Sequence, residues 1–457
     1  MLEFLNRYVT GILVPLMLIP SGIFFAVKLN FFWFRHPAAV LRPLLSGKPR
    51  TPGGISPRRA LCLALAGTLG VGNIVGVSAA INLGGPGAIF WMWISAVAAS
   101  ALKYAETVLA LRHRRTVDGK SEGGTPYYIK DILSSRGLPR AGAAAAAAFA
   151  ALCLVNSLSM GCVVQVNAVA GALEGVLGIR KFIIGAAVAV LAAAVCAGGL
   201  SRISSFTARL VPIMSLGFFV MSAAVLILRA ADLPIVIRLV VTDAFDFGSS
   251  GGILGGISGF LLSRSLRYGT MRGLITNEAG AGTSPLAHSS SDVSSPAEQG
   301  FLGIVEVIVD TVILCAMTAA VILVSYDKVF VWGDNSVMMT ISSYSAVLGT
   351  WSNYAVCIAV LMFGAATVIC QSYYGLECLA YLTPHADRRL TRLCFVPVFS
   401  ACALAGAIIS PGSVWGVADL SMGLMTVINV TVLLLGNREV TEETRAYFGE
   451  KKRIHGK

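Results

Sequence analysis

The chain has 457 residues, of which 56% are hydrophobic and only 13% are charged, and its formal net charge is +12. This apolar share exceeds what a water-soluble domain needs for its core, and apolar runs of about 18 residues recur along the chain. The basic residues are dispersed between those runs, which favours the loops of a membrane protein over a nucleic-acid-binding surface. The composition therefore predicts an all-α integral membrane protein.

Eleven apolar segments are predicted to span the membrane. The first is an extra N-terminal helix (9–29), and the other ten form two sets of five, 59–228 and 252–436, before a basic tail at 437–457. Because five is an odd number, the two sets must be inverted repeats of each other. The predicted spans are 9–29, 59–82, 85–111, 141–172, 181–198, 203–228, 252–290, 301–324, 354–382, 393–409 and 412–436.

The distribution of lysine and arginine predicts the orientation. With the N-terminus outside, the cytoplasmic segments carry 25 of the 35 basic residues. The positive-inside rule therefore predicts an external N-terminus and a cytoplasmic C-terminus. The predicted cytoplasmic segments are 28–59, 112–140, 199–209, 291–300, 382–393 and 437–457.

Each set of five opens with a segment rich in glycine. The first reads AGTLGVGNIVG (66–76), and the second reads TNEAGAG (276–282). Glycine clusters disfavour a helix and leave backbone groups unpaired, which a membrane tolerates only where the break lines a cavity or is buried in protein. Paired breaks in corresponding positions of two halves indicate the binding site of a secondary transporter. The alternative is that Gly72 and Gly76 form a helix-packing notch.

The first break has groups that suit an amino acid zwitterion. Exposed amides and the positive end of a half-helix can hold the carboxylate, and freed carbonyls can accept from the ammonium or coordinate Na⁺. Gly72 would let a ligand approach the backbone, and Asn73 offers a carboxamide. Gln165 and Asn167 lie in an apolar span, where an amide either bridges helices or faces a cavity.

Several charged residues fall at membrane depth, where each carboxylate should have a partner. We expect structural or gating ion pairs in preference to a proton relay. The acidic residues are Glu106, Glu278, Glu306 and Asp310, and the available cations are Lys103, Arg267 and Arg272.

Several stretches resemble the alanine/glycine:cation symporter family, in order along residues 60–440. The resemblance implies a LeuT-like inverted-repeat fold with an added N-terminal helix, in the cell (inner or plasma) membrane. It also implies Na⁺-driven uptake of a small neutral amino acid, with Na⁺ as coupling ion and no cofactor. The matching stretches are GTLGVGNIVGVSAAINLGGPGAIFWMW (67–93), GGTPYYI (123–129), QVNAVA (165–170), RGLITNEAGAGTSP (272–285), SYYG (372–375) and WGVADLSMGLM (415–425).

The same resemblance implies a Na⁺ site and a substrate site. Carbonyls of Ala66 and Leu69 would face the hydroxyl of Thr367; the alternative for this threonine is a bond to its own helix. The chain departs from the family pattern at Val71, Ile275 and Gln371, which replace a threonine, an aromatic residue and a tryptophan. These changes predict a roomier and more polar pocket. The predicted substrate-binding residues are Val71, Gly72, Asn73, Gln165, Ile275 and Gln371.

Other classes of protein fit less well. The five histidines are scattered, and neither a nucleophile elbow nor a Walker sequence is present, so we do not expect an enzyme. Two inverted five-helix repeats suit alternating access better than a substrate-gated channel, and a receptor would be expected to carry a signalling domain. The alternatives within transport are a proton-coupled amino acid carrier and an exchanger.

Overall fold

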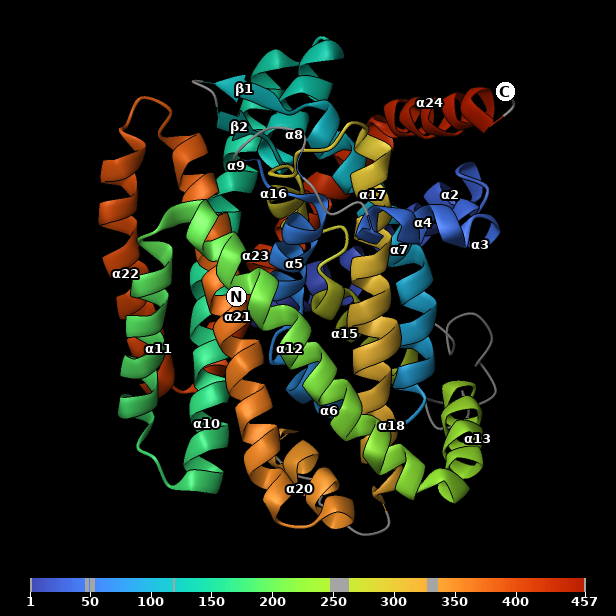
Figure 1. Cartoon of the computed structure of the whole chain (residues 1–457), viewed down its shortest axis with the longest axis vertical. Helices are drawn as coiled ribbons and strands as arrows, with labels where there is room; N and C mark the ends of the chain where they lie inside the picture. Colours follow the sequence, from blue (N-terminus) through green and yellow to red (C-terminus); the bar gives the residue numbers. More distant parts are fainter. Residues whose placement is uncertain are drawn as a thin grey trace.

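The computed structural model describes residues 2–45, 49, 54–117, 120–246, 263–326 and 336–455. The described part is almost entirely helical, and Figure 1 shows its helices as a bundle with α5, α6, α15 and α16 in the middle. The helices before residue 247 are α1 (Leu2–Tyr8), η1 (Val9–Leu13), α2 (Val14–Lys28), α3 (Phe32–Arg35), α4 (Pro37–Leu45), α5 (Pro57–Thr68), η2 (Gly72–Gly76), α6 (Val77–Gly84), α7 (Ala88–Arg112), α8 (Thr125–Ser135), α9 (Pro139–Leu158), η3 (Ser159–Val164), α10 (Gln165–Leu177), α11 (Lys181–Cys196), α12 (Gly199–Leu228), η4 (Ala230–Asp232) and α13 (Leu233–Ala244).

The second half contains the other broken helix and the long helix α21. Its helices are α15 (Arg264–Asn277), α16 (Ser284–His288), α17 (Pro296–Val307), η6 (Ile308–Cys315), α18 (Ala316–Val324), α20 (Ser336–Leu348), α21 (Trp351–Leu382), α22 (Arg388–Ile408), α23 (Pro411–Leu435) and α24 (Asn437–His455).

The described residues do not establish all eleven of the expected membrane spans. Eight described helices are long and apolar enough to span, and the bent pair α5 and η2–α6 makes a ninth. Helix α11 is apolar but has only 16 residues, fewer than the roughly 20 that a straight span needs. The predicted span 252–290 lies in part outside the described residues, and its described part comprises α15, a non-helical stretch and α16. Eight to nine spans are therefore established in the described chain.

Three long helices contain a wider, π-helical turn at the centre of the bundle. These turns are η2 after α5, η3 between α9 and α10, and η6 between α17 and α18. Such turns are rare and occur frequently at functional sites, because the extra residue shifts which side chains face inward. The turns η2 and η6 bring Asn73, Asp310 and Thr311 to the site described below, and η3 brings Gly161 to it.

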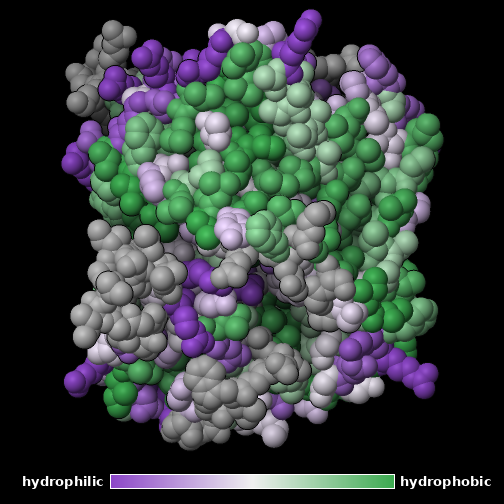
Figure 2. All heavy atoms as spheres, turned by 180° about the vertical axis from the view of Figure 1, so that it is seen from behind, coloured by the Kyte–Doolittle hydropathy of each residue, from purple (hydrophilic) through white to green (hydrophobic). Residues whose placement is uncertain are grey.

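One end of the bundle carries the polar connections. Figure 1 shows the hairpin β1 (Arg115–Val117) and β2 (Lys120–Glu122), together with α8 and α24, at its upper end, while α13 and α20 lie at its lower end. The two strands pair antiparallel. Figure 2 shows hydrophobic residues over most of the middle of the reverse face, with hydrophilic residues concentrated towards its two ends. This banded surface suits a bilayer.

Candidate functional site

The first helix break is a sharp turn at Leu69. This residue has φ −75° and ψ 72°, and the Gly70 N–H donates to the Thr68 carbonyl at 2.8 Å, which together define an inverse γ-turn. The Gly70 N–H is thereby directed away from the Ala66 carbonyl, its regular helical acceptor. The chain then bends by 51° into η2 and α6. Backbone groups at the end of α5 are therefore available inside the bundle.

Gly70 lies between two polar side chains from other helices. A Cβ atom on Gly70 would lie 2.8 Å from both Gln165 Oε1 and Thr367 Oγ1, so a side chain at this position would have to displace them. The Val71 N–H donates to Gln165 Oε1 at 3.0 Å. Thr367 Oγ1 donates to its own helix at Phe363 O (3.1 Å) and lies 3.4 Å from Leu69 O. The structure thus brings Val71 and Gln165, predicted for the substrate site, close to Leu69 and Thr367, predicted for the Na⁺ site.

Gly72 and Gly76, the two glycines of the alternative packing notch, are less crowded than Gly70. A Cβ on Gly72 would meet only Thr276 Cγ2, at 3.6 Å, which is an ordinary contact. A Cβ on Gly76 would meet no described atom within 4 Å. A packing notch needs close backbone approach at both glycines, so this geometry argues against that alternative. The tightest position is Gly70, which the sequence analysis did not single out.

Asn73 joins the first break to η6 through a buried carboxylate. Its Nδ2 donates to Asp310 Oδ1 at 2.6 Å, and Thr311 Oγ1 donates to Asp310 Oδ2 at 2.7 Å. Asn277, the last residue of α15, donates to Thr311 Oγ1 at 3.2 Å. The two broken helices therefore meet at one hydrogen-bonded cluster.

The second break follows Asn277. Glu278 has φ 50°, a left-handed conformation that is costly for a residue with a side chain, and Gly280 (φ 81°) and Gly282 (φ 78°) continue it. Asn429 of α23 donates to the Gly280 carbonyl at 2.9 Å, and Thr125 of α8 donates to the Gly282 carbonyl at 2.5 Å. Side chains from two other helices thus satisfy the backbone of this break.

Glu278 also contacts α21. Gln371 Nε2 donates to Glu278 Oε1 at 3.0 Å, and the Thr283 hydroxyl donates to the other carboxylate oxygen. Gln371 is buried, and its side chain packs on Gly161 of η3. The predicted pocket residue on α21 therefore reaches the second break.

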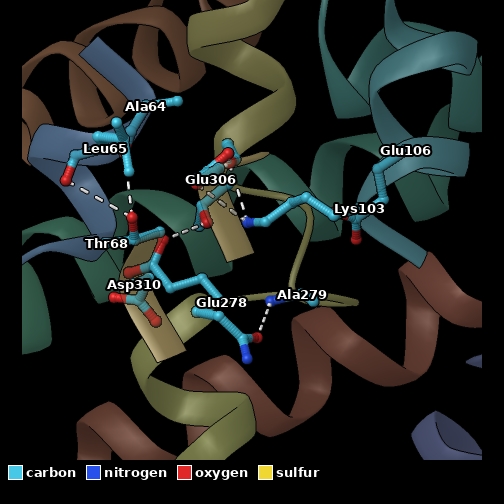
Figure 3. A network of polar contacts seen from close by, with 12 residues as sticks. Ala64, Leu65, Thr68, Lys103, Glu106, Glu278, Ala279, Glu306 and Asp310 are labelled. Carbon is cyan, nitrogen blue, oxygen red and sulfur yellow. Dashed lines mark hydrogen bonds and ion pairs between the residues drawn. The ribbon is translucent and has the colours of Figure 1, made fainter. Parts of the chain in front are cut away.

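A buried ion pair lies beside the second break. Lys103 Nζ of α7 is 3.4 Å from Glu306 Oε1, and both residues contact the Ser284 hydroxyl at 2.8–2.9 Å. His288 Nε2 lies 2.9 Å from Glu306 Oε2, while its Nδ1 accepts from Gln299. Nδ1 is therefore unprotonated and the Nε2 proton faces the carboxylate. Figure 3 shows Lys103 extended towards Glu306, with Glu278 and Asp310 close by.

Within the described residues, three other buried carboxylates have no partner in an ion pair. Asp310 and Glu278 are held as described above, and Glu106 accepts from Asn429 Nδ2 at 2.6 Å. No ion pair joins any of the three to a lysine, arginine or histidine in the part of the chain that the structure describes. The predicted cations Arg267 and Arg272 instead lie over aromatic rings, those of Tyr268 and Trp415, at 5.1 and 5.7 Å. The expected ion pairing is thus present at Glu306 alone.

Asn167 and Ile275 contact other parts of the bundle. Asn167 Nδ2 donates to Gly406 O (2.9 Å) and Ile409 O (2.7 Å), so it bridges α10 to α22. Ile275 packs in a small apolar cluster with Met160, Val164, Ala281, Ala418 and Met422. A cavity of about 500 Å³, lined by Arg267, Tyr268 and Asp419 among others, lies nearby and shares Thr10 and Met271 with the hollow beside Ile275.

The sequence analysis did not assign Ser284, His288, Gln299 or Asn429 to the site. Ser284 and His288 could have been found because they directly follow the glycine break, where the chain re-enters a helix. Gln299 and Asn429 carry only the signal of an amide in an apolar segment, which does not say which helix faces it.

The fold and the site define a multi-pass membrane transporter, in which two broken helices meet at a buried polar centre. Comparison with known proteins supports the same class. The model of the sodium:alanine symporter family matches residues 1–457. The sodium/alanine symporter AgcS of Methanococcus maripaludis is 32% identical over 97% of this chain and 95% of that protein. A Bacillus subtilis protein named as a probable sodium/glutamine symporter, GlnT, is 32% identical over 96% of this chain and 88% of that protein.

The chain belongs to the sodium:alanine symporter family. It is a secondary transporter of amino acids and not an enzyme. Among solved structures, a manganese transporter of Eremococcus coleocola aligns with 85% of this chain and 80% of its own, at 15% identity and a TM-score of 0.49.

Proposed function

We propose that this protein imports a small neutral amino acid together with Na⁺ by alternating access. The observation that carries the proposal is the position of Gly70, between Gln165 Oε1 and Thr367 Oγ1 at the bend between two half-helices. A free amide and a free carbonyl at such a bend are the groups that a zwitterion and a hard cation require.

The proposed substrate site lies on the η2 side of this bend. The substrate carboxylate would take the Val71 N–H, for which Gln165 Oε1 competes at 3.0 Å in this structure. Binding would then release the Gln165 amide to contact the substrate. The other proposed contacts come from Gly72, Asn73, Ile275 and Gln371.

The proposed Na⁺ site lies on the α5 side of the bend. Thr367 Oγ1 is 3.4 Å from Leu69 O, and the Ala66 carbonyl is freed by the γ-turn at Leu69. Three neutral oxygens suit Na⁺, a hard cation that carries a single charge. Sodium binding would then pull α21 and the first broken helix together, which couples the ion to the shape of the substrate site.

The two halves would work as inverted repeats. Each begins with a broken helix, α5 with η2–α6 and α15 with α16, and the extra helix α1–α2 packs against α7 and α23. The hairpin, α8 and α24, which belong to the predicted cytoplasmic segments, lie at one end of the bundle in Figure 1. This clustering supports an orientation with the C-terminus in the cytoplasm and the N-terminus outside the plasma membrane.

Counterflow in proteoliposomes tests the proposal directly. Liposomes loaded with unlabelled alanine should accumulate labelled alanine when Na⁺ is present and lose that accumulation when choline replaces Na⁺. Accumulation that ignores Na⁺ would contradict sodium coupling. The absence of counterflow with every neutral amino acid would contradict the proposed substrate class.

Proton coupling is a second candidate, because one observation favours it. Glu106, Glu278 and Asp310 are buried and form no ion pair with any described residue, and a carboxylate at membrane depth is costly unless it is paired or protonated. A carrier that loads and releases a proton at one of them would be driven by a pH gradient. Uptake that follows an inward proton gradient in Na⁺-free buffer would support this candidate over the first.

A further inference from the structure

Gln371 holds a buried acceptor that lacks a donor. The residue is 1% exposed, and its Nε2 donates to Glu278. No hydrogen-bond donor in the described parts of the chain reaches its Oε1. Buried acceptors in folded proteins are nearly always satisfied, so an orphaned one inside a transport site indicates a group kept for the ligand.

Glu278 determines which end of the Gln371 amide is free. An ionised carboxylate only accepts hydrogen bonds, and both oxygens of Glu278 do so here, from Gln371 and from Thr283. With Glu278 ionised, the NH₂ group of Gln371 faces Glu278, as it does in this structure, and its carbonyl oxygen points elsewhere. Gln371 consequently presents an acceptor to its surroundings and not a donor.

The location of Gln371 matches the side chain of a bound amino acid. Gln165 and Thr367 flank Gly70, and Gln371 lies four residues after Thr367, on the same face of α21 and about 6 Å along it. Across from Gln371 is Gly161, four residues before Gln165. A Cβ on Gly161 would lie 2.5 Å from Gln371 Cβ and Cγ, so the glycine makes room for the longer side chain.

We propose that Gln371 Oε1, positioned by Glu278, recognises the side chain of the substrate and selects neutral amino acids whose side chain donates a hydrogen bond. A hydroxyl or a primary amide would satisfy the orphaned acceptor, whereas the methyl group of alanine would leave it unpaired. A site built around a hydrogen bond rejects an analogue lacking it more strongly than an apolar pocket rejects a missing methylene. This inference rests on the proposed function, because it assumes that an amino acid binds at the Gly70 bend.

Three analogues separate hydrogen bonding from size. Serine and 2-aminobutyrate have equally many heavy atoms, but 2-aminobutyrate replaces the hydroxyl with a methyl group. O-methylserine retains the oxygen and lacks the donor. In competition against alanine counterflow, serine should inhibit at a concentration about 3- to 10-fold lower than either analogue, as expected for one net hydrogen bond.

Equal inhibition by serine and 2-aminobutyrate would overturn the inference while alanine counterflow still supported the proposed function. Stronger inhibition by O-methylserine than by serine would also overturn it, because the site would then present a donor. Absence of alanine counterflow, with no uptake of serine, would instead refute the proposed function.

Two variants distinguish substrate recognition by Gln371 from a purely structural role of the Gln371–Glu278 hydrogen bond, which joins α21 to the second break. Gln371→Met keeps the length of the side chain but removes the amide, so serine and 2-aminobutyrate should then inhibit about equally. Glu278→Gln can donate as well as accept, so Gln371 can turn its NH₂ outward, and O-methylserine should gain relative to 2-aminobutyrate. If the hydrogen bond were purely structural, both variants would change in stability, and the relative inhibition by the three analogues would stay as in the wild type.

Asn167→Met is the matched control, because it removes a membrane-embedded amide that bridges α10 to α22 outside the pocket. It should keep the serine preference of the wild type. Where Gln371→Met does not fold, the wild-type analogue series and Glu278→Gln still decide between the two interpretations.

Discussion

Lys103 and Glu306 form an ion pair, 3.4 Å apart, in which neither side chain is exposed. The pair joins α7 to α17, and Ser284 and His288 attach it to the chain just beyond the second break. Removing two charges from water is costly, so such a pair is stable only when further hydrogen bonds satisfy both groups. Here they do, and the pair fixes the short helix α16 against the rest of the bundle.

Lys103→Met should destabilise the protein by about 3–5 kcal/mol, because it leaves the Glu306 carboxylate buried and unpaired. The double variant Lys103→Met with Glu306→Gln should recover most of that loss, since neither charge remains. Unfolding midpoints in detergent for the wild type, both single variants and the double variant give the coupling between the two sites. Additive losses would show that the two residues do not stabilise each other.

Gly70→Ala should impair substrate binding at least about tenfold while the protein stays folded. The new methyl group would lie 2.8 Å from Gln165 Oε1 and Thr367 Oγ1, and both are side-chain ends that can move aside. Their displacement removes the groups that we place around the ligand. Gly76→Ala is the control in the same segment, because its methyl group would meet no described atom within 4 Å. Wild-type affinity in Gly70→Ala would contradict the location of the site.

The sequence could predict both breaks and the helices around them, because clustered glycines and apolar length are local signals. It could not predict that Gly70 is the crowded position. That crowding arises from Gln165 and Thr367, which lie far along the chain and face Gly70 only after three helices pack. The π-helical turns were also not predictable, since the same residues would fit an ordinary helix. The contact between Ser284 and Glu306 could not be predicted either, because it forms only when their helices pack together, although each residue lies near a recognisable motif.

A tag fused after α24 should be reachable only from the cytoplasm. The basic segments, among them α8 and α24, gather at one end of the bundle, and the positive-inside rule places that end in the cytoplasm. An impermeant reagent should label the tag in inverted vesicles or permeabilised cells and not in intact cells. Labelling in intact cells would contradict this orientation and place the C-terminus outside the cell.

Acid should loosen α24 from the end of α7. Glu439 accepts from His113 Nε2 at 2.8 Å, and this hydrogen bond and the nearby positive charges hold the Glu439 pKa below its ordinary value of 4.5. A depressed carboxylate pKa contributes stability above the ordinary value, and that contribution is lost as the pH falls through the lowered pKa. The protection of the α24 amides against exchange, measured relative to their intrinsic rate at each pH, should therefore fall below about pH 4.5. Glu439→Gln should show fast exchange already at neutral pH, with little further change in acid.

Thr367→Ala should remove the Na⁺ dependence of uptake. Its hydroxyl oxygen lies 3.4 Å from the Leu69 carbonyl oxygen, and the preceding residue, Ala366, has no side-chain oxygen. Thr367→Ser is the matched control, because it keeps the hydroxyl and should keep Na⁺ dependence. Ala366→Ser adds a second hydroxyl to the same turn of α21 and should lower the Na⁺ concentration needed for half-maximal uptake.

Uptake against Na⁺ concentration at fixed pH, and against pH at fixed Na⁺, separates the two coupling candidates. Under sodium coupling, Thr367→Ala flattens the Na⁺ curve and leaves the pH curve of the residual uptake unchanged. Under proton coupling, the Thr367→Ala curve would keep the wild-type shape, because a hydroxyl bonded to its own helix carries no titratable proton. Asp310→Asn would then abolish the pH response, since that carboxylate lies at the junction of the two broken helices and forms no ion pair with a described residue.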